Sequence, residues 1–73
     1  MSKADEMFEK LGYEIKEHKP MFDNNFIDIF NKKIHKIIRF TKGEKTIEIY
    51  GMPKLSMQEL QAINEKCKEL GWL

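Results

Sequence analysis

Apolar residues in this chain recur at helical spacing near both ends and alternate with polar residues in between. The clearest helical pattern lies in residues 55–70, where the apolar positions share one side of the predicted helix: Leu60, Ile63, Cys67 and Leu70. Near the start, residues 2–12 carry a narrower stripe of the same kind: Ala4, Met7, Phe8 and Leu11. The pattern predicts a helix at each end of a central sheet.

Both predicted helices have recognisable ends. Ser56 followed by Glu59 forms a capping box, in which each side chain accepts a hydrogen bond from the other residue's backbone N–H. Leu55 and Leu60 have the spacing of a hydrophobic staple, and a weaker capping signal stands at Ser2. Each helix is then followed by a Leu-Gly-aromatic sequence, which is typical of a Schellman close. The helix boundaries are therefore well defined by local signals.

Four segments between the helices have the composition or the alternation of strands: residues 13–18, 26–31, 34–41 and 45–50. Turn residues separate these segments, at 19–25 (Pro20 and an Asp-Asn-Asn run), 31–33 and 42–44. We predict a single α+β domain over residues 1–73, because a chain of 73 residues is too short for a second core. Its sheet is a four-stranded antiparallel meander flanked by an N-terminal and a C-terminal helix, in the order α-β-β-β-β-α.

Residues 25–38 also allow a second interpretation. Four apolar residues in this segment fit a helical period: Ile27, Phe30, Ile34 and Ile37. Strands are favoured because Ile and Phe dominate and no good helix formers fill the gaps. The short Gly-centred turn that follows also suits a hairpin.

Short even-length loops in the two later hairpins would place Ile38 opposite Ile47 and Ile29 opposite Ile34. One face of the sheet would then be apolar: Ile27, Ile29, Ile34, Ile38, Phe40, Ile47 and Ile49. We expect the C-terminal helix to cover this face. Lys36 is the exception in the row, and we expect its ammonium group to reach water along its aliphatic stem.

The opposite face of the predicted sheet mixes aromatic, apolar and charged residues: Phe26, Asp28, Phe30, Lys33, His35, Ile37, Arg39, Thr46, Glu48 and Tyr50. Three aromatic residues and an isoleucine make this face too apolar for ordinary solvent exposure. Either the N-terminal helix covers it or a partner does. The candidate binding residues are Phe26, Phe30, Lys33, His35, Arg39 and Tyr50.

The charge of the chain bears on the class of partner. Thirteen basic and twelve acidic residues leave a net charge of +1, which argues against a protein that depends mainly on phosphate contacts. Interleaved aromatic and basic side chains nevertheless suit single-stranded nucleic acid, because bases stack on rings while cations hold phosphates. Asp28 and Glu48 on the same predicted face oppose this alternative.

The sequence contains no arrangement that indicates catalysis. Asp28 opposite His35 resembles an acid–base pair, although a cross-strand ion pair is the commoner arrangement, and no nucleophile is placed nearby. His18, His35 and Cys67 lack the spacing of a zinc site, so we expect no metal and no cofactor. The single cysteine suggests a buried thiol in a reducing compartment, and no apolar run approaches a membrane span. We expect a cytoplasmic protein that is not an enzyme and does not bind membranes.

Residues 4–13 (ADEMFEKLGY) and 57–72 (MQELQAINEKCKELGW) resemble a diffuse set of small uncharacterised proteins from bacteriophages and prophages of low-GC Gram-positive bacteria. The resemblance implies a phage accessory role inside a bacterial host cell and carries over no functional residue. Together with the absence of a catalytic pattern, it leads us to expect a binding module that contacts a host or phage protein or forms a homodimer. Inhibition of a host system is one form that such contact could take. Single-stranded nucleic-acid binding is the alternative.

Overall fold

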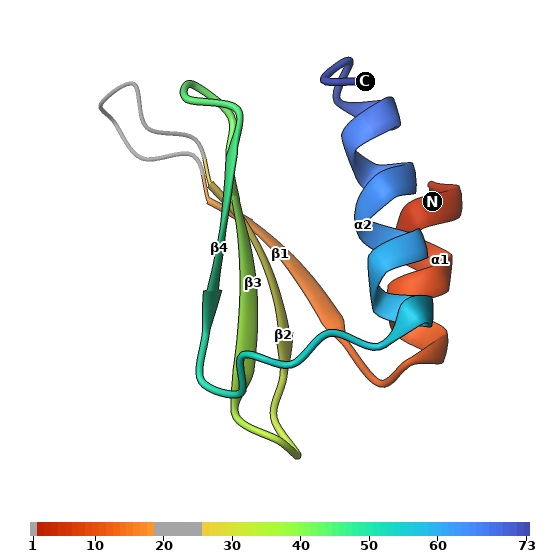
Figure 1. Cartoon of the computed structure of the whole chain (residues 1–73), viewed down its shortest axis with the longest axis vertical. Coiled ribbons are helices and arrows are strands. Elements are labelled where there is room, and N and C mark those ends of the chain that lie inside the picture. Colours follow the sequence, from red (N-terminus) through yellow and green to blue (C-terminus); the bar gives the residue numbers. More distant parts are fainter. Residues whose placement is uncertain (1, 19–25) are drawn as a thin grey trace.

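The structure is a computed structural model that describes residues 2–18 and 26–73. It confirms the α+β fold (Figure 1), with the elements α1 (Lys3–Lys10), β1 (Glu14–His18), β2 (Phe26–Asn31), β3 (Lys36–Thr41), β4 (Thr46–Tyr50) and α2 (Met57–Glu69). The strands form one antiparallel sheet in the order β1-β2-β3-β4. The helical interpretation of residues 25–38 is wrong from residue 26 onward, because β2, a turn and the start of β3 occupy that segment. The turn predicted at residues 19–25 lies outside the described residues.

The predicted helix ends are confirmed. The Ser56 hydroxyl accepts a hydrogen bond from the Glu59 N–H at 3.0 Å, and the Glu59 carboxylate accepts one from the Ser56 N–H at 2.7 Å. After α2, the Trp72 N–H donates to the Cys67 carbonyl at 2.8 Å, and Gly71 takes a left-handed φ of 77°. α1 begins with a serine cap and ends in the same Schellman geometry.

Both helices pack on the same face of the sheet, where they lie side by side (Figure 1). The Ala4 N–H donates to the Glu69 carboxylate at 2.9 Å, and the Lys66 ammonium group donates to Asp5 at 3.0 Å. Phe8 is fully buried, and its ring meets Phe40 of β3 at 6.5 Å. α1 therefore buries its narrow apolar stripe in the same core as α2, and it does not cover the opposite face of the sheet.

The core lies between the two helices and the inner face of the sheet. Its buried apolar residues are Ala4, Phe8, Tyr13, Ile27, Ile29, Ile38, Phe40, Ala62, Ile63 and Cys67. This confirms that α2 covers the central part of the isoleucine-rich face and that Cys67 is buried, and burial raises the pKa of its thiol. Leu60 does not join the core and remains 47% exposed. The buried line on α2 instead runs through Glu59, Ala62, Ile63, Lys66 and Cys67.

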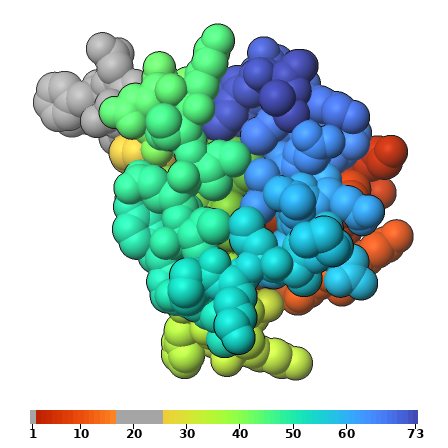
Figure 2. Space-filling model, viewed as in Figure 1, coloured from red at the N-terminus to blue at the C-terminus, as the bar shows by residue number. Residues whose placement is uncertain are grey.

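The predicted strand register is wrong, although the assignment of residues to faces survives. Ile29 pairs with Ile38 and Ile38 pairs with Ile49, because both hairpins close over four-residue loops. The observed partners are four and two residues away from the predicted ones. A shift by an even number of residues keeps every strand side chain on its predicted face of the sheet. Ile34 falls in the β2–β3 turn, and Ile47 remains 36% exposed on the edge strand β4. Figure 2 shows β4 and the segment after it at the surface beside α2.

Neither helix in the described part of the chain is long and apolar enough to cross a membrane.

Candidate functional site

The face of the sheet opposite the helices is the candidate site, and we call it the open face. Pairing between neighbouring strands places its side chains in cross-strand rows, such as Lys16–Asp28–Arg39–Glu48 and Glu14–Phe30–Ile37–Tyr50. Its residues on β2, β3 and β4 are Phe26, Asp28, Phe30, Ile37, Arg39, Thr41, Thr46, Glu48 and Tyr50. In the part of the chain that the structure describes, no helix lies over this face (Figure 1).

Arg39 occupies the centre of the open face and is held by Asp28. Its Nε and Nη2 atoms donate to the two Asp28 carboxylate oxygens at 2.7 and 3.0 Å, a bidentate geometry. This hydrogen bonding raises the pKa of Arg39. The guanidinium carbon lies 4.8 Å from the Phe26 ring centroid and 5.5 Å from that of Tyr50. The cation is therefore already paired with a carboxylate and packed against two rings.

The cross-strand partner of Asp28 on β3 is Arg39, and His35 lies elsewhere, so the predicted Asp28–His35 pair is wrong. His35 falls in the four-residue β2–β3 turn, where it takes a left-handed φ of 52°. Lys33 lies in the same turn, and its N–H donates to the Asn31 side chain at 3.0 Å. The longer loop moves both residues from the sheet face to its end.

Tyr50 lies at the end of β4 and is fixed by Glu48. Its hydroxyl donates to the Glu48 carboxylate at 2.8 Å, and this bond raises the pKa of Tyr50. The ring remains 42% exposed. An exposed aromatic ring with a fixed orientation is suited to contact with a partner.

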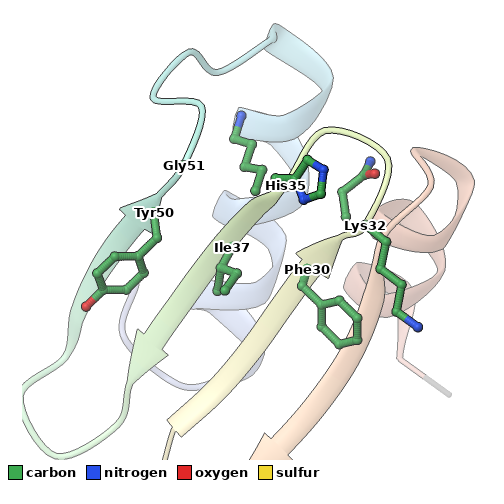
Figure 3. Close-up of a pocket in the computed structure, with 8 residues that line it drawn as sticks. Phe30, Lys32, His35, Ile37, Tyr50 and Gly51 are labelled. Atoms are coloured by element: carbon green, nitrogen blue, oxygen red, sulfur yellow. The ribbon is translucent and has the colours of Figure 1, made fainter.

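An open depression of about 280 Å³ lies at the end of the open face, next to the β2–β3 turn. Phe30, Ile37 and Tyr50 form its apolar wall, and we call these three residues the apolar seat (Figure 3). The rest of the lining comes from Asn31, Lys32, His35, Lys36 and Gly51. The predicted site residues thus separate into two groups. Phe26 and Tyr50 pack against Arg39 at the centre of the face, whereas Phe30, His35 and Tyr50 line the depression, and Lys33 lies in the adjoining turn.

Lys36, Glu59 and Tyr13 form a buried polar network that the sequence pattern did not predict. Lys36 is 1% exposed, and its Nζ donates to the Glu59 carboxylate at 3.0 Å and to the Lys54 carbonyl. The Tyr13 hydroxyl donates to the same Glu59 oxygen. The expectation that Lys36 reaches water is wrong, because α2 places a carboxylate directly over the lysine. Two features of the sequence could have indicated this network: the capping glutamate Glu59, and Lys36 as the lone charged residue in an otherwise apolar row of the sheet.

The network shifts the ionisation of its members. Burial alone would raise the pKa of Glu59, but hydrogen bonds from Tyr13, the Ser56 N–H and Lys36 outweigh it and lower that pKa to about 2. Burial and the bond to Glu59 together raise the pKa of Tyr13 well above its usual value. Ionised Glu59 therefore joins the segment between α1 and β1, the start of β3 and the start of α2.

We expect the stability of the fold to fall in acid because of Glu59. A carboxyl group whose pKa drops from 4.5 to about 2 on folding contributes about 3 kcal/mol of stability. That contribution is complete above pH 4.5 and is lost as the pH falls toward about 2. Urea denaturation across this range should show a steeper loss for the wild type than for Glu59→Gln, which cannot titrate. Parallel pH profiles for the two proteins would contradict the assignment.

No family model, curated protein or solved structure matches the chain. Within residues 2–18 and 26–73, no group of three or more His, Cys, Asp and Glu side chains is arranged to hold a metal ion.

Proposed function

We propose that this chain is a non-enzymatic protein-binding module that contacts its partner through the open face. The supporting observation is a sheet face with Phe26, Phe30, Ile37 and Tyr50 on it that no described helix covers. In a domain of this size, one face of the sheet suffices to build the core, so the apolar residues on the second face are available for a partner. Exposed aromatic residues are enriched where proteins bind one another.

A protein partner fits this face better than single-stranded nucleic acid does. Nucleic-acid grooves need cations along the track of the backbone, with rings free for stacking. Here Arg39 is paired with Asp28 and packed against two of the rings, and Glu48 adds a second carboxylate nearby. A phosphate at the centre of the face would have to displace Asp28 from its bidentate pair.

The proposal extends to the setting that the resemblance implies. The module would act as a phage or prophage accessory protein in the cytoplasm of a bacterial host. Contact with a host or phage protein, or with a second copy of this chain, would be its mode of action.

Panning a random-peptide display library on the immobilised protein tests the proposal. Tyr50→Ala removes an exposed ring from the open face, whereas Leu60→Ala removes an equally exposed side chain from α2 on the opposite side. We expect peptides selected on the wild type to lose at least about thirtyfold in affinity on Tyr50→Ala, the size of a hot-spot truncation. Leu60→Ala should retain full affinity.

Two results would contradict the proposal. One is equal peptide binding by both variants. The other is an oligothymidylate that binds at low salt and displaces the selected peptides, which would favour the nucleic-acid alternative. A dimer in sedimentation that dissociates on Tyr50→Ala would support the proposal and identify a second copy as the partner.

A further inference from the structure

The apolar seat lies in a depression large enough to accept a side chain of a partner. Phe30, Ile37 and Tyr50 come from three adjacent strands and point to the same side of the sheet (Figure 3). The depression of about 280 Å³ lies just below the range of about 300–1,000 Å³ typical of small-molecule sites. A single aromatic or large aliphatic side chain would fit within it.

The seat adjoins a locally basic end of the molecule. Lys32 lies on its rim, with its Nζ 5.9 Å from the centre of the Phe30 ring and 3.8 Å from the Glu14 carboxylate. A second hollow beside it is lined by Lys10, Lys32 and Lys33 with Glu14 as its acidic residue, three cations against one anion. The charges of the whole chain nearly cancel, so this end departs from the average.

Two of these cations, Lys32 and Lys33, lie in the β2–β3 turn. Lys32 and Lys33 are both exposed on a four-residue loop that closes at the Asn31–Lys36 pair. Among the described residues, Lys33 has no acidic side chain within ion-pair distance. The turn therefore offers cationic groups next to an apolar recess whose walls are β-strands.

We propose that the apolar seat binds an aromatic or large aliphatic anchor residue of an acidic peptide segment, whose neighbouring carboxylates contact Lys32 and Lys33. This inference rests on the proposed function and names the class of partner. Charge complementarity selects an acidic segment, because Lys32 lines the depression that holds the seat and Lys33 follows it in the same turn. A nucleic-acid strand fits less well, because beyond the turn the cations Lys16 and Arg39 are interspersed with the carboxylates of Glu14, Asp28 and Glu48 along the face.

The test is a nuclear magnetic resonance titration with synthetic peptides. The probe is a short peptide with a central Trp flanked on both sides by Asp and Glu, and the controls replace the Trp with Ala or the acidic residues with Lys. We expect the acidic Trp peptide to shift amide signals of residues 30–37 and 50–51. Each control peptide should bind at least about tenfold more weakly.

Protein variants complete the test. Lys32→Glu with Lys33→Glu should weaken binding of the acidic Trp peptide at least about tenfold, whereas Lys3→Glu with Lys68→Glu makes the same charge change on the exposed helix surfaces and should not. Equal binding of the basic peptide, equal loss in both charge variants, or tighter binding of an oligothymidylate would overturn the inference. If library peptides depend on Tyr50 but the acidic Trp peptide does not bind, this inference fails and the proposed function stands. If no peptide depends on Tyr50, both fail.

Discussion

Replacing Lys36 with methionine is expected to lower the free energy of unfolding by about 3–5 kcal/mol, the cost of breaking a buried ion pair from one side. The substitution preserves most of the volume of the side chain but leaves Glu59 without its cation, in a site where the Lys36 ammonium is almost completely shielded from water. It also leaves the Lys54 carbonyl without the hydrogen bond that Lys36 donates. A domain of 73 residues has a total stability of about 4–11 kcal/mol, so much of the margin would disappear.

Urea denaturation at neutral pH measures this effect, with Lys68→Met as the matched control. Lys68 is an exposed lysine on α2, and its replacement should change the stability by no more than about 0.5 kcal/mol. If Lys36→Met behaved like Lys68→Met, the Lys36–Glu59 pair would not be the buried tie between the sheet and α2 that the structure shows.

Replacing Gly51 with alanine is expected to cost about 2–5 kcal/mol, for two reasons that add. Gly51 has a left-handed φ of 84°, which an L-residue adopts at a cost of about 1–2 kcal/mol. A Cβ at this position would also collide with the backbone carbonyl of His35, which cannot rotate away as a side chain can. Overpacking of this kind adds about 1–3 kcal/mol.

Replacing Gly71 with alanine separates the cost of the left-handed backbone from the cost of the steric collision. Gly71 has a similar φ of 77°, but nothing lies within 4 Å of the position a Cβ would take. Its replacement should therefore show the backbone cost alone, about 1–2 kcal/mol. Thermal or urea unfolding of both variants measures the difference, and equal losses would show that the end of β4 does not pack against the β2–β3 turn.

The close approach of Gly51 to His35 also bears on the candidate site. It brings the end of β4 against the β2–β3 turn, and both segments line the depression that holds the apolar seat. A change at Gly51 should therefore disturb the site as well as the fold. For this reason, Tyr50→Ala and the lysine variants are the cleaner tests of binding.

Features set by neighbouring residues could be predicted from the sequence. The capping box, the Schellman ends and three of the four strand starts, to within a residue, depend on contacts within a few positions of the chain, and the structure confirms them. The division of strand residues between the two faces was also predictable, because alternation survives any even change of register. Phe26, Phe30, Arg39 and Tyr50 therefore lie on the open face as predicted.

Loop length was harder to predict, and it displaced part of the candidate site. A four-residue turn with His35 in a left-handed conformation carries Lys33 and His35 away from the face, and it gives Asp28 the partner Arg39. Asn-Lys-Lys contains no glycine that would have marked the turn's geometry, so the sequence offered little to choose between turns of different length.

By itself, the sequence determined the elements, their ends and the two-sided character of the sheet, since these follow from local hydrogen bonding and from periodicity. Only the tertiary structure decided that both helices lie on one side, that Leu60 stays exposed, and that Lys36 and Tyr13 meet at Glu59. These outcomes depend on which apolar surfaces bury each other most completely, a competition between residues as far apart in the chain as Ala4 and Glu69. Among the described residues, the same competition leaves no helix over the open face, and that face carries the proposed function.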